Sequence, residues 1–405
     1  MEHELVLLNM QGPALIATQG WASLTAEAAF VRAGELARSL GRADEASWSK
    51  YELATLYEVQ GDYERSEALL EEVLAEPLRS RGAPGLVDSH ELLACSLFHQ
   101  GEFGPALESA ERGLEAYDDM SGNAFMAAYG DNPGIACHSW AALSLWHLGR
   151  PDAARARAAM SVGLSEDMRR RHGLATALVL SATVTQCRRE EAEARELAEA
   201  GIDAAARKGF IYRVAMGTIL RGWARAAQGA ADEGITELRR GIELARMTGA
   251  RMDDAYFLGL LADALVGAGE PGEALDVLRE ALEAVPRGGR FFYDAELHRL
   301  RGQALRALGE AEEAEASLRR ALGVAHDQGG RSLELRAAVS LGGLLRDTGR
   351  PQEAQAIVAA AHRGFEEGFD TPDLREAAAF LAEVPETTRA RISGAPAPGR
   401  GRPRR

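Results

Sequence analysis

Histidine and cysteine side chains would be the most informative for chemistry, because they serve as metal ligands, bases and nucleophiles. The nine histidines are scattered along the chain. Two pairs, His90 with His99 and His138 with His147, are nine residues apart, a spacing that does not align two side chains well on one helical face. No H-E-x-x-H, C-x-x-C or acid-rich calcium loop is present. The sequence therefore predicts no metal site.

Nucleophilic catalysis is not indicated either. Cys95, Cys137 and Cys187 lie far apart in apolar helical stretches, as expected of small core residues in a reducing cytoplasm. Serines such as Ser139 and Ser181 lie within predicted helices and outside any G-x-S-x-G elbow. Because no nucleophile and base can be paired, we predict no catalytic residue and no cofactor, and we expect that the chain is not an enzyme.

A turn signature at a fixed interval organises the chain. A glycine followed by a short polar or proline-containing turn recurs, with three consecutive intervals of 40 residues, at Gly61, Gly101, Gly149, Gly229, Gly269, Gly309 and Gly349. The missing member is expected near Arg189, and the step from Gly101 to Gly149 is longer, at 48 residues. Each turn predicts the junction between two helices.

The residues around each turn explain this prediction. Glycine ends a helix by adopting a left-handed conformation that other residues disfavour. Alanine five residues later, as in Ala274, Ala314 and Ala354, lets the two helices approach closely. No stretch alternates with the period of a strand. The sequence thus predicts an all-α, right-handed α-solenoid of about eight helix pairs with a period of about 40 residues.

The Gly-x-(Tyr/Phe/Pro)-x-x-Ala turn resembles the tetratricopeptide motif, whose usual period is about 34 residues. HEAT-like repeats have the right length without this turn and are the second interpretation. The predicted organisation begins with an N-terminal segment (residues 1–20), followed by the solenoid (21–385). The solenoid includes an insertion (118–136) and a capping helix (373–383), and a disordered basic tail (386–405) follows it.

Other segments resemble the tetratricopeptide-like C-terminal region of bacterial signalling proteins that join a class III adenylate/guanylate cyclase to an AAA-type ATPase. The similarity covers residues 45–383. It is most distinctive in residues 129–137, 140–146, 217–224, 295–302, 332–338 and 368–374. The resemblance implies a sensory or scaffolding module without the catalytic domains.

The catalytic parts of that family have no counterpart here. A phosphate-binding loop needs the lysine of G-x-x-x-x-G-K-[ST]. The chain has two lysines, Lys50 and Lys208, and neither follows a glycine. A cyclase domain would also need strand-rich segments, which are not predicted.

Charge and hydropathy restrict the partners and the compartment. The net charge is -15, and six arginines with one glutamate in residues 386–405 leave the rest still more acidic, which disfavours nucleic acid. No helix-turn-helix fits before Trp21. No stretch approaches 18 apolar residues and no secretory signal is evident, which predicts a cytoplasmic protein without membrane contact.

The first helix of each pair lines the concave side in tetratricopeptide arrays, and its polar and aromatic residues are the candidates for partner binding. They are Tyr212, Arg213, Arg221, Trp223, Tyr256, His298, Arg299 and Arg336, together with Tyr129, Asp131 and Asn132 of the insertion. Guanidinium and aromatic groups suit a peptide or a carboxylate. Alternatively, these aromatic residues pack between repeats and the arginines pair with the abundant glutamates.

Three functions follow from this organisation. The first is a non-catalytic protein-interaction or scaffold module in bacterial signalling that binds a peptide or partner domain in its groove. The second is a ligand-sensing regulatory subunit of a separately encoded cyclase or ATPase. The third, an enzyme with its active site in the groove, requires titratable groups that converge in one pocket. Neither the partner's identity nor the oligomeric state follows from the sequence.

Overall fold

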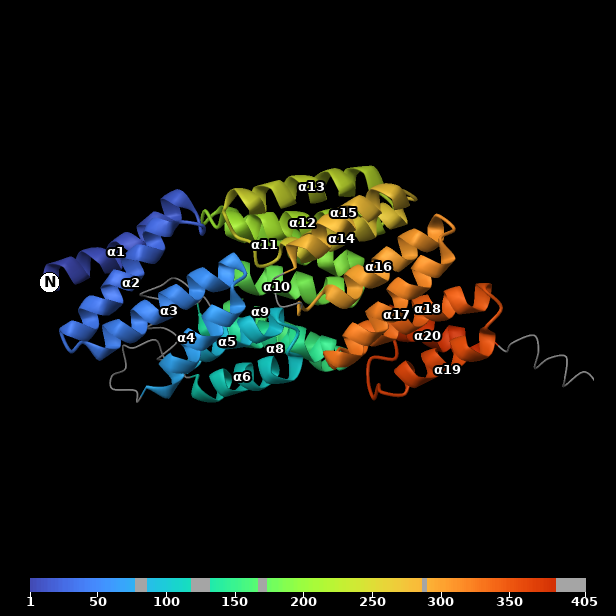
Figure 1. The fold of residues 1–405 in the computed structure, drawn as a ribbon, viewed down its shortest axis with the longest axis horizontal. Coiled ribbons are helices and arrows are strands. Elements are labelled where there is room, and N and C mark those ends of the chain that lie inside the picture. The colour runs from blue at the N-terminus through green and yellow to red at the C-terminus, as the bar shows by residue number, and fades with distance from the viewer. Residues whose placement is uncertain (77–85, 118–131, 167–172, 286–289, 384–405) are drawn as a thin grey trace, which may run out of the picture.

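The computed structural model describes the chain in five stretches, residues 1–76, 86–117, 132–166, 173–285 and 290–383. Every regular element in these stretches is an α-helix. The helices follow one another as a curved array, which confirms the predicted all-α solenoid (Figure 1). None of the described helices is long and apolar enough to cross a membrane.

Two helices, α1 (Glu2–Gln19) and α2 (Leu24–Ser39), precede the regular repeats. Eight helix pairs follow: α3 (Ala43–Gln60) with α4 (Tyr63–Ala75), α5 (Leu86–His99) with α6 (Phe103–Ala116), α8 (Pro133–His147) with α9 (Pro151–Glu166), α10 (Leu174–Cys187) with α11 (Glu191–Ala206), α12 (Ile211–Ala227) with α13 (Ala231–Met247), α14 (Asp254–Gly267) with α15 (Pro271–Ala284), α16 (Asp294–Ala307) with α17 (Ala311–Asp327), and α18 (Arg331–Asp347) with α19 (Pro351–His362). The last helix in the described part of the chain is α20 (Pro372–Ala382).

The turns inside the pairs have the backbone conformation that their glycines predicted. The seven glycines of the turn signature have φ between 74° and 96°. The remaining turn, between α10 and α11, is formed by Arg189 at φ 57°. Arg189 is the one residue other than glycine with a positive φ in the described chain. The repeat therefore keeps its geometry even where its glycine is replaced.

Small residues after each turn hold the helices of a pair together. Ala274, Ala314 and Ala354 are completely buried between the paired helices. Gly234 takes the same place in α13, where its Cα faces the backbone of α12. One buried apolar cluster extends from Ala54 in α3 to Leu333 in α18, so successive pairs stack as predicted.

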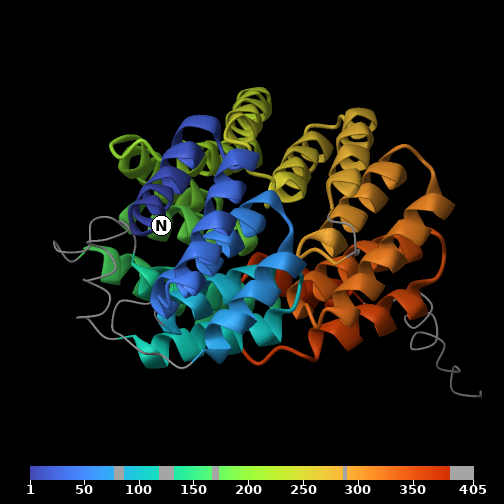
Figure 2. The ribbon, with the colours of Figure 1, turned by 60° about the vertical axis from the view of Figure 1, so that its left-hand side comes forward.

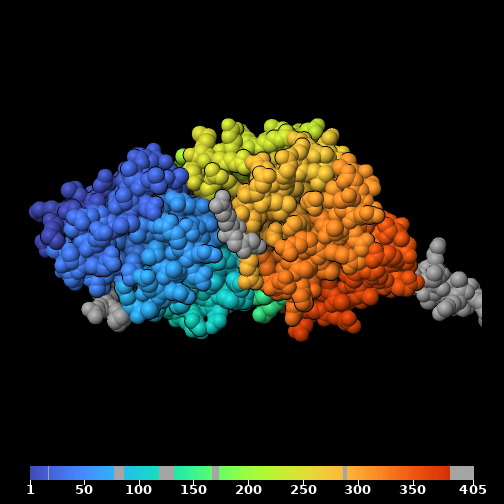
Figure 3. Space-filling view, in the orientation of Figure 1, coloured from blue at the N-terminus to red at the C-terminus, as the bar shows by residue number. Residues whose placement is uncertain are grey.

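The superhelix is wound so tightly that later repeats touch earlier ones. The loops that precede α14 and α16, and the first turn of α18, dock on the C-terminal ends of α3, α5 and α8. Three hydrogen bonds mark these contacts: Arg251 N to Val59 O (2.8 Å), Phe292 N to His99 O (2.9 Å) and Ser332 Oγ to Trp146 O (2.5 Å). The N-terminal helices in blue and cyan accordingly lie beside the orange C-terminal half (Figures 1 and 2). Their surfaces meet in the space-filling view (Figure 3).

The ends of the array contain further helices. Residues 1–20 hold α1, which packs on α2 and buries Leu5 against Ala33 and Leu36. The predicted capping helix at 373–383 corresponds to α20. Most of the predicted insertion, residues 118–131, and the tail from residue 386 lie outside the described residues.

Candidate functional site

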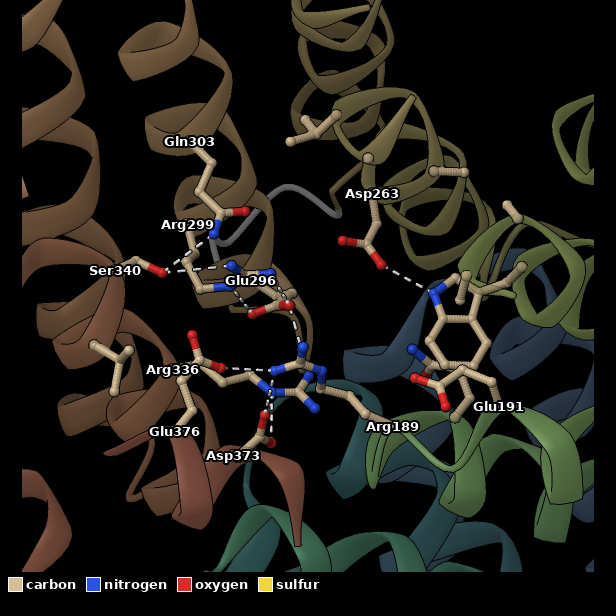
Figure 4. A pocket seen from close by; sticks show the side chains of 18 of the residues that line it. Arg189, Glu191, Asp263, Glu296, Arg299, Gln303, Arg336, Ser340, Asp373 and Glu376 are labelled. Carbon is tan, nitrogen blue, oxygen red and sulfur yellow. Dashed lines mark hydrogen bonds and ion pairs between the residues drawn. The ribbon is translucent and has the colours of Figure 1, made fainter. Parts of the chain in front are cut away.

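A cavity of about 550 Å³ lies on the inner face of the C-terminal half. The first helices of successive pairs supply most of its wall, and the α10–α11 turn and α20 supply the rest (Figure 4). Its charged and large polar lining residues are Gln186, Arg189, Glu191, Trp223, Asp263, Glu296, Arg299, Gln303, Arg336, Asp373 and Glu376. The helices predicted to face the partner thus enclose a real pocket.

The 40-residue period arranges these side chains in two rows. Trp223, Asp263 and Gln303 are 40 residues apart and come from α12, α14 and α16. In the same way, Glu296, Arg336 and Glu376 come from α16, α18 and α20. Because each repeat presents the same helical position to the interior, equivalent positions become neighbours.

One wall of the pocket is a closed network of ion pairs. Glu296 accepts hydrogen bonds from Arg299 Nε and Nη2 at 2.8 and 2.7 Å. Its Oε1 is also 3.6 Å from Arg336 Nη1, and Arg336 Nε donates to Asp373 Oδ2 at 2.8 Å. Arg189 Nη1 reaches Asp373 and Glu376 of α20 at 3.2 and 2.9 Å. Figure 4 shows these groups pointing toward one another.

Burial and charge act in opposite directions on Glu296. Burial alone would raise the pKa of its carboxyl group, but Arg299 and Arg336 lower that pKa below its usual value. The side chain is 4% exposed, so the two guanidinium groups are what keeps the buried carboxylate ionised. The charged groups of the wall formed by α16, α18 and α20 are therefore paired with one another or with Arg189.

The opposite wall carries two carboxylates, and Arg299, which pairs with Glu296, also interacts electrostatically with one of them, Asp263. Trp223 is 4% exposed, and its Nε1 donates to Asp263 Oδ2 at 2.9 Å. Glu191 lies on the same side of the pocket (Figure 4). Within the described residues neither Asp263 nor Glu191 forms an ion pair. The pocket thus presents an aromatic ring and two carboxylates to whatever enters it.

Three of the residues selected from the sequence, Trp223, Arg299 and Arg336, line this pocket. The other selected residues that the structure describes do not line the pocket, and each contacts another residue of the solenoid. These partners are Asp253 for Tyr212, Met216 for Arg213, Glu237 for Arg221, Gln186 for Tyr256, Asp294 for His298 and Tyr117 for Asn132. Asn132 also caps α8 by accepting from Gly134 N at 2.9 Å. Tyr129 and Asp131 lie outside the described residues.

The sequence analysis did not select Asp263, Gln303, Glu296 or Glu376. The 40-residue period would have found all four. Adding 40 and 80 to Trp223 gives Asp263 and Gln303, and moving 40 residues either way from Arg336 gives Glu296 and Glu376. The position of a residue within the 40-residue repeat, together with its type, would thus have identified these pocket residues.

Arg189 combines a strained backbone with a side chain in the pocket, and this combination can be measured. Arg189→Ala and Arg189→Gly both remove the guanidinium that contacts Asp373 and Glu376, but only the alanine variant keeps a left-handed residue with a Cβ. We expect the glycine variant to be more stable than the alanine variant by about 1 kcal/mol in urea unfolding. Equal stabilities, or a more stable alanine variant, would show that the turn relaxes.

Comparisons with known proteins agree with this architecture. The model of the tetratricopeptide repeat matches residues 295–327, which form most of α16 and α17. A crystal structure of a Rap protein complexed with competence and sporulation factor covers 95% of this chain and 99% of its own, with 12% identity and a TM-score of 0.59. The fold is a tetratricopeptide-like solenoid.

Two further structures are similar over most of the solenoid. NprR in complex with its cognate peptide NprX covers 85% of this chain and 97% of its own, with 10% identity and a TM-score of 0.53. The apo form of the quorum sensor NprR from B. thuringiensis covers 90% and 98%, with 14% identity and a TM-score of 0.52. No curated protein matches the sequence. At these identities the likeness concerns the fold alone.

Proposed function

We propose that the solenoid is a non-catalytic interaction module that binds a peptide, or an extended segment of a partner protein, in the pocket between α12 and α20. The observation that carries this proposal is the pocket itself, which is open to solvent and lined by the inner helices of successive repeats. An extended chain crosses several repeats and meets the same helical position of each one.

The charges of the pocket specify the kind of peptide. Arg189, Arg299 and Arg336 are already matched by Glu296, Asp373 and Glu376. Asp263 and Glu191, beside Trp223, form no ion pair with the described residues, and Arg299, the cation whose charge interacts with Asp263, already pairs with Glu296. A lysine or arginine side chain, or a free amino terminus, would pair with these carboxylates and lie against the indole ring. We therefore propose a peptide that places a cationic group at this wall.

Known proteins of this fold support a role in recognition. NprR, which has the same fold, binds its cognate peptide, and the Rap protein binds competence and sporulation factor. The sequence resemblance to the tetratricopeptide-like region of cyclase–ATPase proteins points to signalling. We propose that the occupied solenoid acts on a signalling protein such as a separately encoded cyclase or ATPase.

A selection from a random heptapeptide library displayed on phage tests the proposal. We expect the selected peptides to carry Lys or Arg. Asp263→Asn keeps the acceptor for Trp223 Nε1 and removes the charge, so it should weaken binding of a synthetic selected peptide about 10-fold or more, as for a hydrogen bond to a charged group. Fluorescence polarisation at constant ionic strength measures the dissociation constants.

Asp276→Asn is the matched control, because Asp276 is 74% exposed on α15 and lies outside the pocket. This variant should bind the selected peptide like the unmodified chain. A selection that yields no peptide, or a peptide that binds both variants equally, would contradict the proposal.

A further inference from the structure

A second group of chemically active side chains lies in the N-terminal half, away from the pocket. Glu58 lies near the C-terminal end of α3, and Cys95 and His99 lie one turn apart on α5. The three are between 1% and 4% exposed. Cys95 Sγ is 3.4 Å from Glu58 Oε1, Cys95 Sγ is 3.6 Å from His99 Nδ1, and Glu58 Oε1 is 3.5 Å from the same nitrogen.

These three distances have the size that a shared metal ion requires. Zinc binds thiolate sulfur at about 2.3 Å and histidine nitrogen or carboxylate oxygen at about 2.0–2.2 Å in a tetrahedron. Two ligands of one tetrahedral zinc are therefore about 3.3–3.7 Å apart, which follows from the same bond lengths. All three observed distances fall in this interval. Their donor types are also those that zinc selects.

The surroundings of His99 match the second layer of a metal site. Its other ring nitrogen, Nε2, is 3.2 Å from Asp253 Oδ1, in the loop before α14. The second oxygen of Asp253 accepts a hydrogen bond from the Tyr212 hydroxyl at 2.7 Å. A histidine that binds metal through one nitrogen commonly donates the other N–H to a carboxylate, which fixes the tautomer and the ring.

Two features describe the site before a cation binds. His99 Nδ1 is 2.8 Å from its own helix carbonyl, Cys95 O, and Nε2 is 3.2 Å from Asp253 Oδ1, so without a cation both ring nitrogens face acceptors. Zinc binding at Nδ1 replaces the hydrogen bond to Cys95 O and leaves the proton on Nε2, which donates it in a hydrogen bond to Asp253. Burial raises the pKa of the Cys95 thiol well above its usual range. Glu58 Oε2 is buried and forms no hydrogen bond of normal geometry with the described residues, although the Ser66 and Ser96 hydroxyls interact with the Glu58 carboxylate.

We propose that Glu58, Cys95 and His99 bind one zinc ion, with Asp253 and Tyr212 as the supporting layer. Binding forms the zinc–sulfur and zinc–nitrogen bonds and releases the thiol proton and the His99 Nδ1 proton to solvent, without oxidation or reduction. The three ligands come from α3 and α5, so the ion would join these two helices. The hydrogen bond between His99 and Asp253 links the site to the repeat that docks back on them. This site is independent of the peptide pocket.

The full chain, unfolded in denaturant with a chelator and refolded with Co²⁺, provides the test. Cobalt occupies zinc sites and absorbs in the near ultraviolet when a thiolate is its ligand, so we expect this band to saturate at one equivalent and to disappear when Zn²⁺ is added. Zinc retained after desalting, measured by mass spectrometry of the elements, should equal one per chain. Zinc should also raise the thermal unfolding midpoint.

The other two cysteines provide matched controls, since Cys137 and Cys187 are equally buried. Cys95→Ser should lose the cobalt band and the retained zinc, whereas Cys137→Ser should keep both. Glu58→Gln is a second variant that preserves side-chain size, and it should weaken zinc retention at least 10-fold. A refolded chain that retains no zinc, or a cobalt band that survives in Cys95→Ser, would overturn the proposal.

Discussion

Arg336→Met should destabilise the solenoid by about 3–5 kcal/mol, the cost of removing one partner from a buried ion pair. Arg336 is 9% exposed in a wall where it pairs with Asp373 and Glu296 and lies over the ring of Trp146. It also donates a hydrogen bond to the carbonyl of Cys187. Methionine keeps most of the volume but leaves the buried carboxylate of Glu296 and the partly buried one of Asp373 with one cation fewer.

Urea unfolding followed by circular dichroism measures this loss, and hydrogen exchange locates it. Because Asp373 belongs to α20, the amides of α20 should lose protection before those of α12. Arg239→Met is the control, since the Arg239–Glu273 pair is about half exposed on both sides and such pairs contribute about 0–1 kcal/mol. If both variants lose the same stability, the Arg336 network does not hold the C-terminal repeats.

The regular part of this fold was predictable because its cause is local. Each turn needs a residue that tolerates a positive φ, and glycine is the residue for which this costs least. The spacing of glycines alone therefore located the eight turns, including the one at Arg189 where the glycine is absent. The conformation at Arg189 is imposed by the two helices that it connects. The 40-residue interval predicts a turn near residue 189, but it does not predict that an arginine adopts the positive φ of that turn.

The docking of one superhelical turn on another was not predictable in the same way. Phe292 binds the end of α5 and Ser332 binds the end of α8, across separations of almost five repeats. Such contacts depend on the small rotation between successive repeats, which accumulates along the array and is not encoded in any one motif. The pocket and its boundaries depend on the same rotation.

The cluster of Glu58, Cys95 and His99 shows the limit for individual sites. The spacing of Cys95 and His99 places both on one face of α5. Glu58 is 37 residues before Cys95, and the supporting Asp253 is 154 residues after His99. Only the stacking of α3 on α5 and the return of the α13–α14 loop bring them together. The expectation of no metal site rested on motifs that are contiguous in sequence, so it did not test this arrangement.

Gly234→Ala should destabilise the solenoid by about 1–3 kcal/mol, the usual cost of overpacking. A Cβ at this position would lie 2.5 Å from Gly222 O and 2.6 Å from Ala226 N, both backbone atoms of α12. Neither can move without separating α12 from α13. The sign is informative, because alanine in place of a free helical glycine normally stabilises by about 0.5–1 kcal/mol.

Gly323→Ala supplies that comparison, since Gly323 lies within α17 and a Cβ there would contact nothing within 4 Å. We expect it to raise the urea midpoint while Gly234→Ala lowers it. Gly222→Ala introduces a clash at the same contact, 2.9 Å from Gly234 O. Once either alanine has separated the helices, the second meets less resistance, so the double variant should lose less than the sum of the single losses. If the losses of stability in the two single variants add up in the double variant, the two glycines accommodate their neighbours independently. The small residue after each turn would then not serve to let the paired helices approach closely.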